Sequence, residues 1–240
     1  MQIDPGPCLW DLPVPHAAPP GLEVLAVGAD LEPATLISAY ATGLFPMHVS
    51  TSDSDGDSHR ELGWWSPDPR GVLPLDGLRV SRSLTKSMRR FTYSADVAFR
   101  EVMRACATDR SDGDWITDEF VAQYQRLHEM GWAHSVEVWR DGELVGGLYG
   151  VEIGGLFAGE SMFHRETDAS KAALVVLVDI LRSAGSIGER LLDVQWCTDH
   201  LATLGVIEIP RADYLERLET ALELPPAFAD TATPEHLGPH

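Results

Sequence analysis

Apolar and polar residues follow two different periods in the second half of the chain. Between Thr117 and Met130, apolar residues recur every three or four positions, as on the buried face of an amphipathic helix. From Ser135 to Arg140, apolar and polar residues alternate, which is typical of a half-buried strand. Asp141-Gly142 is a hairpin turn signal, and residues 143–151 follow as the return strand. The change of period predicts a helix followed by an antiparallel meander.

The same criteria predict further elements around this meander. Helices are predicted over residues 33–41, 97–107, 169–183, 198–204 and 212–222, and strands over residues 156–162, 191–196 and 206–209. Asp168 is the expected cap of the helix over residues 169–183, and Gly185 is its expected stop. From residue 97 onward, the order indicates an α+β domain with a mixed, mostly antiparallel sheet. A meander followed by a helix and a parallel strand suits the GNAT-type acyltransferase architecture, an analogy of fold alone.

The first third of the chain has a different composition. Residues 1–20 are rich in proline and lack periodicity, so they predict an irregular arm. Residues 48–62 are dominated by polar and acidic side chains, which predicts a flexible loop. Two prolines within residues 64–70 predict irregular backbone, because proline lacks a donor and restricts the residue before it.

Charge is distributed unevenly along this acidic chain. The net charge is −19, but residues 67–110 carry eight Arg, one Lys and five acids, a net of +4. Five cations lie within twelve positions of that segment: Arg79, Arg82, Lys86, Arg89 and Arg90. This cluster is interpreted either as an ordinary solvated helix face or as a patch that binds phosphates.

Several classes of protein are disfavoured by the composition. The longest apolar stretch, residues 172–181, is too short to span a membrane, and no basic region followed by an apolar run suggests a secretory signal. The odd number of cysteines favours a reducing, cytoplasmic location over a disulfide framework; they are Cys8, Cys106 and Cys197. Cys197 and His200 lack a second pair of ligands, so no metal site is expected. The sequence contains no coiled-coil pattern that would indicate obligate assembly, so we expect a monomer.

Seven blocks of irregular composition appear along the chain in a fixed order. They are AYATGLFPM at 39–47, WWSPDPRGVLP at 64–74, SRSLTK at 81–86, WITDEFVAQYQRLHEMGWAHSVEVW at 115–139, DGELVGGLYGVEIGGLFAGESMF at 141–163, DASKAAL at 168–174 and LLDVQWCTDHLATLGVIEIPRADYL at 191–215. In this order they closely resemble the leucyl/phenylalanyl-tRNA–protein transferase family. The resemblance covers residues 22–215, which is most of the chain.

This resemblance implies an arrangement of domains. Residues 1–63 are then the arm and the start of a small N-terminal domain, and residues 64–96 complete that domain with the Trp/Pro loop and the basic segment. Residues 97–240 form the GNAT-like catalytic domain.

The resemblance also implies a reaction. Leu, Phe and less readily Met move from aminoacyl-tRNA to proteins that begin with Arg or Lys, which marks those proteins for N-end-rule degradation. The charged tRNA is a substrate, and no cofactor is implied.

Two positions depart from the family pattern. The family usually has Phe-Pro-Trp where this chain has Phe45-Pro46-Met47, and that Trp is expected near the aminoacyl adenosine. Methionine keeps a polarizable apolar surface but lacks an aromatic face. Leu177 stands where the family commonly has an aromatic pocket residue. The preference between Leu and Phe is therefore open.

Aminolysis of an aminoacyl ester requires positioning more than covalent catalysis. The attacking α-amine has an ordinary pKa of about 7.7–8.0, so only modest basicity is needed, and alignment of the reactants lowers the barrier. Asp193 and Gln195 lie two apart on a predicted strand, and that period directs both side chains to one face. Asp193 can accept the proton or hold the amine, and Gln195 can orient the ester or Asp193. A solvated strand end is the alternative. The resemblance points to the same two residues.

Substrate contacts are expected from several further residues. Glu160 lies in an apolar, Gly-rich strand and can bind the donor's α-amino group or the acceptor's basic side chain; an internal salt bridge with Lys171 or Arg165 is the alternative. Residues expected to enclose the donor side chain, or else to be ordinary core, are Leu148, Phe157, Met162 and Leu192. Trp65 and Trp115 are candidates to stack on the terminal adenosine, and the alternative is that each belongs to the hydrophobic core. The five cations would contact phosphates of the tRNA.

Two other functions remain as alternatives. An acetyl-CoA-dependent N-acetyltransferase of the same fold would carry an R/Q-x-x-G-x-G/A loop at the start of a helix. Residues 182–188 read RSAGSIG, which fails at Ile187 and follows the end of a predicted helix. A non-catalytic tRNA-binding or degron-binding protein would explain the basic cluster but not the pairing of Asp193 with Gln195.

Overall fold

Two β-sheets carry the fold of the computed structural model, which describes residues 1–52, 58–108 and 116–228. The smaller sheet has the strand order β1-β3-β2, and the larger has the order β10-β4-β9-β8-β7-β6-β5. The strands are β1 (Val24–Val27), β2 (Phe45–Ser52), β3 (Ser58–Trp65), β4 (Arg70–Val72), β5 (Thr92–Ala95), β6 (Ala133–Arg140), β7 (Glu143–Ile153), β8 (Leu156–His164), β9 (Leu191–Gln195) and β10 (Ile207–Ile209).

The larger sheet is mixed and mostly antiparallel, as predicted. Strands β6, β7 and β8 form the expected meander, and β9 lies parallel to β8 after a helical crossover. Strands β4 and β10 extend the sheet beyond β9, and β5 pairs with β6 at the opposite edge. Both β4 and β5 come from residues 64–96, so the large sheet takes strands from before residue 97.

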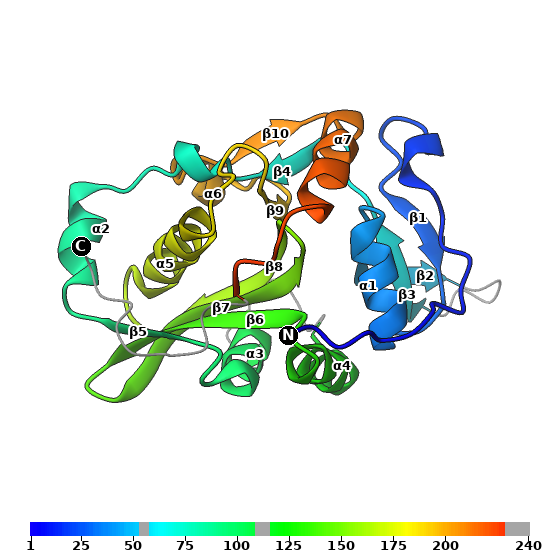
Figure 1. Ribbon diagram of the computed structural model, residues 1–240. Coiled ribbons are helices and arrows are strands. Elements are labelled where there is room, and N and C mark those ends of the chain that lie inside the picture. Colours follow the sequence, from blue (N-terminus) through cyan, green and yellow to red (C-terminus); the bar gives the residue numbers. More distant parts are fainter. Residues whose placement is uncertain (53–57, 109–115, 229–240) are drawn as a thin grey trace.

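Helices cover both faces of the larger sheet, and Figure 1 shows α5 on one face and α3 with α4 on the other. The α-helices are α1 (Pro33–Ala41), α2 (Arg82–Met88), α3 (Phe99–Thr108), α4 (Asp118–Glu129), α5 (Ala169–Ser183), α6 (Asp199–Thr203) and α7 (Arg211–Leu222). Short 3-10 helices cover Pro15–Ala17 and Leu75–Gly77. Each face has its own hydrophobic cluster, and the cluster on the α3 and α4 side continues into α1 and the smaller sheet.

Local signals account for most of these boundaries. The Thr117 hydroxyl accepts a hydrogen bond from the Phe120 amide and caps α4, as predicted. Asp141 and Gly142 both have positive φ angles, of 52° and 84°, which the tight turn between β6 and β7 requires. Asp168 precedes α5 as expected, but its side chain does not cap the helix. It instead accepts hydrogen bonds from Ser87 and from a lysine one turn into α5.

The predicted flexible loop over residues 48–62 is wrong for its described part. Strands β2 and β3 pair from Phe45 opposite Trp65 to Ser52 opposite Ser58, so most of this polar segment is a β-hairpin. Cross-strand backbone hydrogen bonds do not depend on side-chain polarity, and composition therefore misled the prediction. Likewise, Trp64 and Trp65 end β3 rather than lying in irregular backbone, and Arg70 begins β4.

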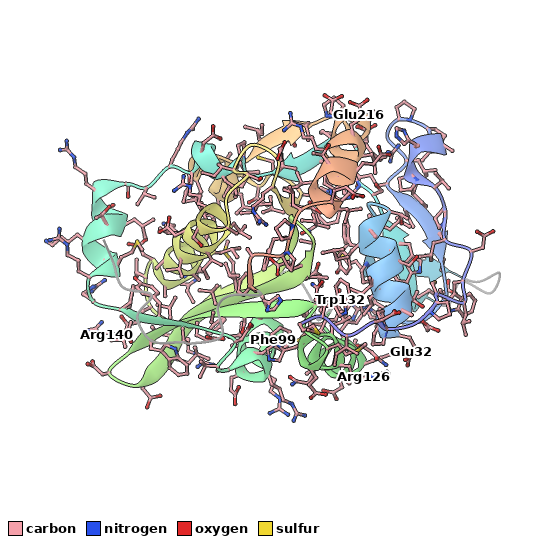
Figure 2. All side chains as sticks on the ribbon, viewed as in Figure 1. Glu32, Phe99, Arg126, Trp132, Arg140 and Glu216 are labelled. Atoms are coloured by element: carbon pink, nitrogen blue, oxygen red, sulfur yellow. The ribbon has the colours of Figure 1, made fainter. Side chains whose placement is uncertain are left out.

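The small N-terminal part packs directly on the larger one. Gly43 follows α1 with a φ of 87°, and an added Cβ there would lie 2.6 Å from the Leu215 side chain. Glycine therefore permits both the turn and the close approach to α7. Figure 2 shows Glu32 and Arg126 together where α1 meets α4, and their side chains form an exposed ion pair at 2.8 Å.

The N-terminal arm lies irregularly along the surface, apart from its one 3-10 turn, as its composition predicts. Arg211 at the start of α7 is buried and donates hydrogen bonds to the carbonyls of Ala18, Pro19 and Leu22. The indole nitrogen of Trp132, which Figure 2 labels, donates a hydrogen bond to the Ile3 carbonyl at 2.7 Å. Among the described residues, no helix combines the length and hydrophobicity that a membrane span requires.

Candidate functional site

A pocket of about 300 Å³ lies between strands β7, β8 and β9 and helices α5 and α6. Its apolar wall includes Leu148, Met162 and Leu192, three of the four residues expected to enclose a donor side chain, together with Leu177. The other lining residues are Tyr149, Gly159, Glu160, Ser161, Leu174, Val194, Gln195, Thr198, His200 and Leu201. A largely apolar lining with a few polar groups is typical of a small-molecule site.

Phe157 is the expected pocket residue that lies elsewhere. Its side chain is fully buried and stacks on Phe228, with 5.7 Å between ring centroids. Residues along β8 reach different depths of the core, and Phe157 lies near the start of the strand, away from the pocket lining. Sequence alternation alone does not distinguish these positions.

A β-bulge in β8 sets Glu160, a residue of the pocket lining, out of the regular strand alternation. Across β7 and β8, Gly150 pairs with Gly159 whereas Tyr149 pairs with Ser161, so Glu160 is an extra residue in β8. A bulge of this kind redirects a side chain out of the regular alternation. The sequence shows only two nearby glycines as a signal of it.

The Glu160 carboxylate meets neutral partners from the N-terminal part and from α4. The Tyr40 hydroxyl donates to Oε1 at 2.6 Å and the Tyr124 hydroxyl to Oε2 at 3.3 Å. Lys171, expected as an alternative salt-bridge partner, pairs instead with Asp168. Burial raises the pKa of Glu160 to about 7, with a further increase from the charge of Asp193, although the tyrosine hydrogen bonds and the charge of Arg70 oppose this shift. Glu160 therefore titrates near neutral pH.

Asp193 is enclosed by donors and has no exposed surface. Arg70 Nε and Nη2 bind its two oxygens at 2.9 and 2.6 Å, and the Tyr214 hydroxyl donates to Oδ2 at 3.0 Å. The backbone amide of Gln195 donates to Oδ1 at 2.9 Å. Burial lowers the pKa of Arg70, but the adjacent Asp193 more than offsets this and raises it overall. Asp193 is thus part of a buried, bidentate ion pair.

Gln195 departs from the strand alternation that was expected to place it beside Asp193 on one face. Its backbone has a φ of 61°, and it lines the pocket together with Val194, whereas Asp193 does not line it. The two residues are joined by the hydrogen bond from the Gln195 backbone amide to the Asp193 carboxylate, and the Gln195 side chain takes no part in it. The Gln195 side-chain nitrogen is buried and has no hydrogen-bond acceptor in the described structure.

The aromatic candidates are placed unequally. Trp65 is partly exposed, donates to the Met47 carbonyl at 2.9 Å and meets Trp196 edge to face at 5.8 Å between centroids. Met47 therefore lies beside the indole that was expected to stack on a base. Trp115 lies outside the described residues.

The five cations of the basic cluster lie on and around α2, and all are exposed: Arg79, Arg82, Lys86, Arg89 and Arg90. The Ser87 hydroxyl on α2 donates to Asp168, which ties this helix to the start of α5. Figure 1 shows α2 at the end of the molecule opposite the smaller sheet. A cation group therefore adjoins the helix that forms one wall of the pocket.

Comparison with known proteins decides the family. The family described as "Leucyl/phenylalanyl-tRNA protein transferase N-terminal domain" matches residues 29–68, and "Leucyl/phenylalanyl-tRNA protein transferase" matches residues 72–219. The chain belongs to the leucyl/phenylalanyl-tRNA protein transferase family. It is a transferase, which bears out the resemblance noted in its sequence.

Full-length relatives agree with this family membership. The leucyl/phenylalanyl-tRNA–protein transferase of Herpetosiphon aurantiacus is 50% identical over 82% of this chain and 98% of the relative. Those of Pseudoalteromonas atlantica and Escherichia coli are 48% and 49% identical, over 89% and 86% of this chain and 88% and 85% of the relatives. Among solved structures, a GCN5-related N-acetyltransferase from Kribbella flavida is 16% identical with a TM-score of 0.35, over 59% of this chain and 55% of its own.

Sequence reasoning missed the residues that hold both carboxylates of this transferase. Arg70 and Tyr214 bind Asp193, and Tyr40 and Tyr124 bind Glu160. All four lie inside the blocks that resemble the family; helical periodicity predicts Tyr124 on a buried face, but no pattern marks any of the four as a partner of a carboxylate. Within the described residues, no three His, Cys, Asp or Glu side chains come together in a group able to hold a metal ion.

Proposed function

We propose that this transferase moves leucine or phenylalanine, and less readily methionine, from aminoacyl-tRNA to the α-amino group of proteins that begin with Arg or Lys. The observation that carries the proposal is a glutamate in the lining of a largely apolar pocket of about 300 Å³. Such a site accepts an apolar side chain beside an ammonium group, which is the chemistry of an aminoacyl ester. Marking of the acceptor for N-end-rule degradation follows from the same proposal.

The apolar wall accounts for the donor side chains. Leu148, Met162 and Leu192 enclose the aliphatic or aromatic group, and Leu177 contributes an aliphatic surface. An apolar pocket separates related side chains by only about 1–3 kcal/mol per methylene group, so transfer of methionine is expected beside leucine.

Glu160 supplies the charge recognition. Glu160 belongs to the pocket lining, and among the described residues the hydrogen-bond donors to its carboxylate are the neutral hydroxyls of Tyr40 and Tyr124. An incoming ammonium group, from the donor amino acid or from the basic side chain of the acceptor, would give this carboxylate a directly bound cation beside the more distant charge of Arg70. With a pKa of about 7, Glu160 is only partly ionised at neutral pH. A bound cation would lower that pKa and favour the ionised carboxylate.

Gln195 orients the reacting ester, and Asp193 has a supporting role. The oxygens of Asp193 are occupied by four donors from Arg70, Tyr214 and the Gln195 amide, and the carboxylate has no exposed surface. Accepting a proton from an attacking amine would require a free and accessible oxygen. Asp193 therefore holds the site in place, and aminolysis proceeds by positioning the amine beside an already activated ester.

The tRNA contacts are assigned to the exposed cations around α2 and to Trp65. Arginine and lysine side chains that contact phosphates bind without reading sequence, which suits an enzyme that accepts several tRNA species. Trp65 is partly exposed next to Met47 and can stack on the terminal adenosine. We also propose that the domain boundary lies near residue 69, between the two matched families, because β4 belongs to the large sheet.

The deciding experiment compares two acceptor peptides that differ only in the first residue. Radiolabelled leucine on its tRNA is offered to a peptide beginning with Arg and to the same peptide beginning with Ala. We expect label in the Arg peptide alone. A parallel reaction with labelled acetyl-CoA tests the acetyltransferase alternative, and label from acetyl-CoA with none from leucyl-tRNA would overturn the proposal. Binding of leucyl-tRNA without any transfer would favour the non-catalytic alternative.

A further inference from the structure

We propose that Arg70, with Tyr214, is a positioning residue that acts through Asp193 to hold Gln195 in its working conformation at the pocket. The inference rests on the proposed function, because it concerns the reaction in that pocket. It assigns a role to two residues that are not part of the pocket lining.

Arg70 is held rigidly at the start of β4. Its guanidinium lies 5.0 Å from the ring centroid of Phe45 and 4.4 Å from that of Tyr214, and its Nη1 donates to the Gly43 carbonyl at 3.1 Å. The side chain is 1% exposed. Its planar fork meets both oxygens of Asp193, which fixes the carboxylate plane as well as its position.

Asp193, fixed in this way, in turn binds the backbone of Gln195. One carboxylate oxygen binds both Arg70 Nε and the backbone amide of Gln195, each at 2.9 Å. Gln195 has a φ of 61°, a left-handed conformation that is uncommon for a residue other than glycine and persists when its surroundings impose it. Two hydrogen bonds hold that conformation: the Gln195 amide donates to the fixed carboxylate at 2.9 Å, and the Trp196 amide donates to the Val194 carbonyl at 2.7 Å across the turn.

The left-handed turn brings Gln195 to the pocket. In a regular strand, Gln195 would share the face of Asp193, but it lines the pocket beside Val194 instead. Its side-chain nitrogen is buried without an acceptor, which is an uncommon state for a buried donor. A donor left unpaired at a pocket is suited to a substrate oxygen, and here the oxygen available is that of the aminoacyl ester.

A double-mutant cycle tests this chain of contacts. Arg70→Lys keeps the charge but loses the bidentate fork, and Gln195→Ala removes the amide. We expect Arg70→Lys to lower kcat for leucine transfer about tenfold, with the KM for leucyl-tRNA changed by less than about twofold. In the Gln195→Ala background, Arg70→Lys should lower kcat no further, because the residue it positions is gone. Additive effects of the two substitutions would overturn the inference.

Arg211→Lys is the matched control, since Arg211 is also buried but binds the carbonyls of the N-terminal arm. It should lower the thermal unfolding temperature and leave kcat within about twofold of the wild type. An equal loss of kcat in Arg211→Lys would mean that any weakened buried arginine impairs the enzyme, and the assigned role of Arg70 would be wrong.

Tyr214→Phe gives a second cycle in case Arg70→Lys does not fold. It deletes the hydroxyl that binds Asp193 but keeps the ring beneath Arg70. We expect a smaller loss of kcat, about threefold, that again disappears in the Gln195→Ala background. The wild type is assayed first: if it transfers no leucine, the proposed function fails, whereas transfer with additive cycles defeats only the role of Arg70 and Tyr214.

Discussion

Two carboxylates on neighbouring strands of one sheet have opposite surroundings. Asp193 on β9 has an arginine fork, a tyrosine and a backbone amide, and is closed to solvent. Glu160 on β8 has two tyrosine hydroxyls and lines the pocket. Asp193 is paired with an arginine of the same chain, whereas Glu160 has no cation among the hydrogen-bond donors that the described residues supply.

This difference indicates that the Asp193 carboxylate stabilises the fold, whereas the Glu160 carboxylate is suited to binding a charged substrate group. A buried carboxylate with a complete set of donors is tied into the fold, and its removal disturbs every partner. A carboxylate that meets only neutral donors keeps a raised pKa, here about 7, and retains an unfilled preference for a cation. Four predictions follow the comparison from the largest expected effect on folding to the smallest.

Arg70→Met should have the largest effect, because it leaves Asp193 buried without its counter-charge. We expect the free energy of unfolding to fall by about 3–5 kcal/mol, measured by urea denaturation at neutral pH. Arg126→Met is the control, since Arg126 pairs with Glu32 at the surface and should cost about 0–1 kcal/mol. Equal losses in the two variants would remove the distinction between the buried pair and an ordinary surface pair.

Glu160→Gln should change how stability depends on pH. The pKa of this carboxyl is 4.5 in the unfolded chain and about 7 in the folded chain. Between these two pH values the folded state therefore binds more protons than the unfolded state. The contribution of Glu160 to stability is therefore present at low pH and is lost as pH rises through that window. We expect Glu160→Gln to gain about 1–3 kcal/mol relative to the wild type between about pH 5 and about pH 8.

The measurement for this variant is urea denaturation of both proteins at each pH, so that other titrating groups cancel in the difference. A difference that stays constant across the window would show that Glu160 does not titrate there.

Tyr40→Phe should have a smaller effect of the same kind. The Tyr40 hydroxyl donates to Glu160 and opposes the rise of its pKa, so its loss should move the titration of Glu160 to higher pH. The lost hydrogen bond should cost about 1–2 kcal/mol of stability. The titration is followed by NMR of a 13C-labelled glutamate carboxyl, with Tyr93→Phe as control because Tyr93 donates to the Met88 carbonyl instead. An unchanged or lower pKa in Tyr40→Phe would contradict the assignment.

Substitution of Arg89 and Arg90 by Gln should leave folding unchanged, since both side chains are exposed. Loss of two phosphate contacts should weaken tRNA binding and reduce the slope of log affinity against log salt concentration by about 2. Filter binding over a range of NaCl concentrations measures this slope. Replacing the exposed Arg100 and Arg104 of α3 removes the same charge on another surface and should leave the slope unchanged. An equal reduction there would mean that only net charge matters.

Much of the fold was accessible from the pattern of the chain. The helix over residues 117–130, the turn at Asp141-Gly142 and the meander with its parallel fourth strand all follow from local periodicity and turn chemistry, and the structure confirms them. Local signals failed where pairing is long-range: the hairpin of β2 and β3 contradicts its polar composition, and β4 and β5 join strands far along the chain.

The sequence by itself determined the family, the helices and strands with strong periodicity, and Asp193, Gln195 and Glu160 as the residues to examine. Tertiary structure alone decided how those residues differ. Arg70 reaches Asp193 across 123 positions, and Tyr40 reaches Glu160 across 120. The bulge at Glu160 and the left-handed turn at Gln195 also re-aim side chains that alternation would place elsewhere. Charge pairing and burial depend on such distant contacts, and no local pattern of residues records them.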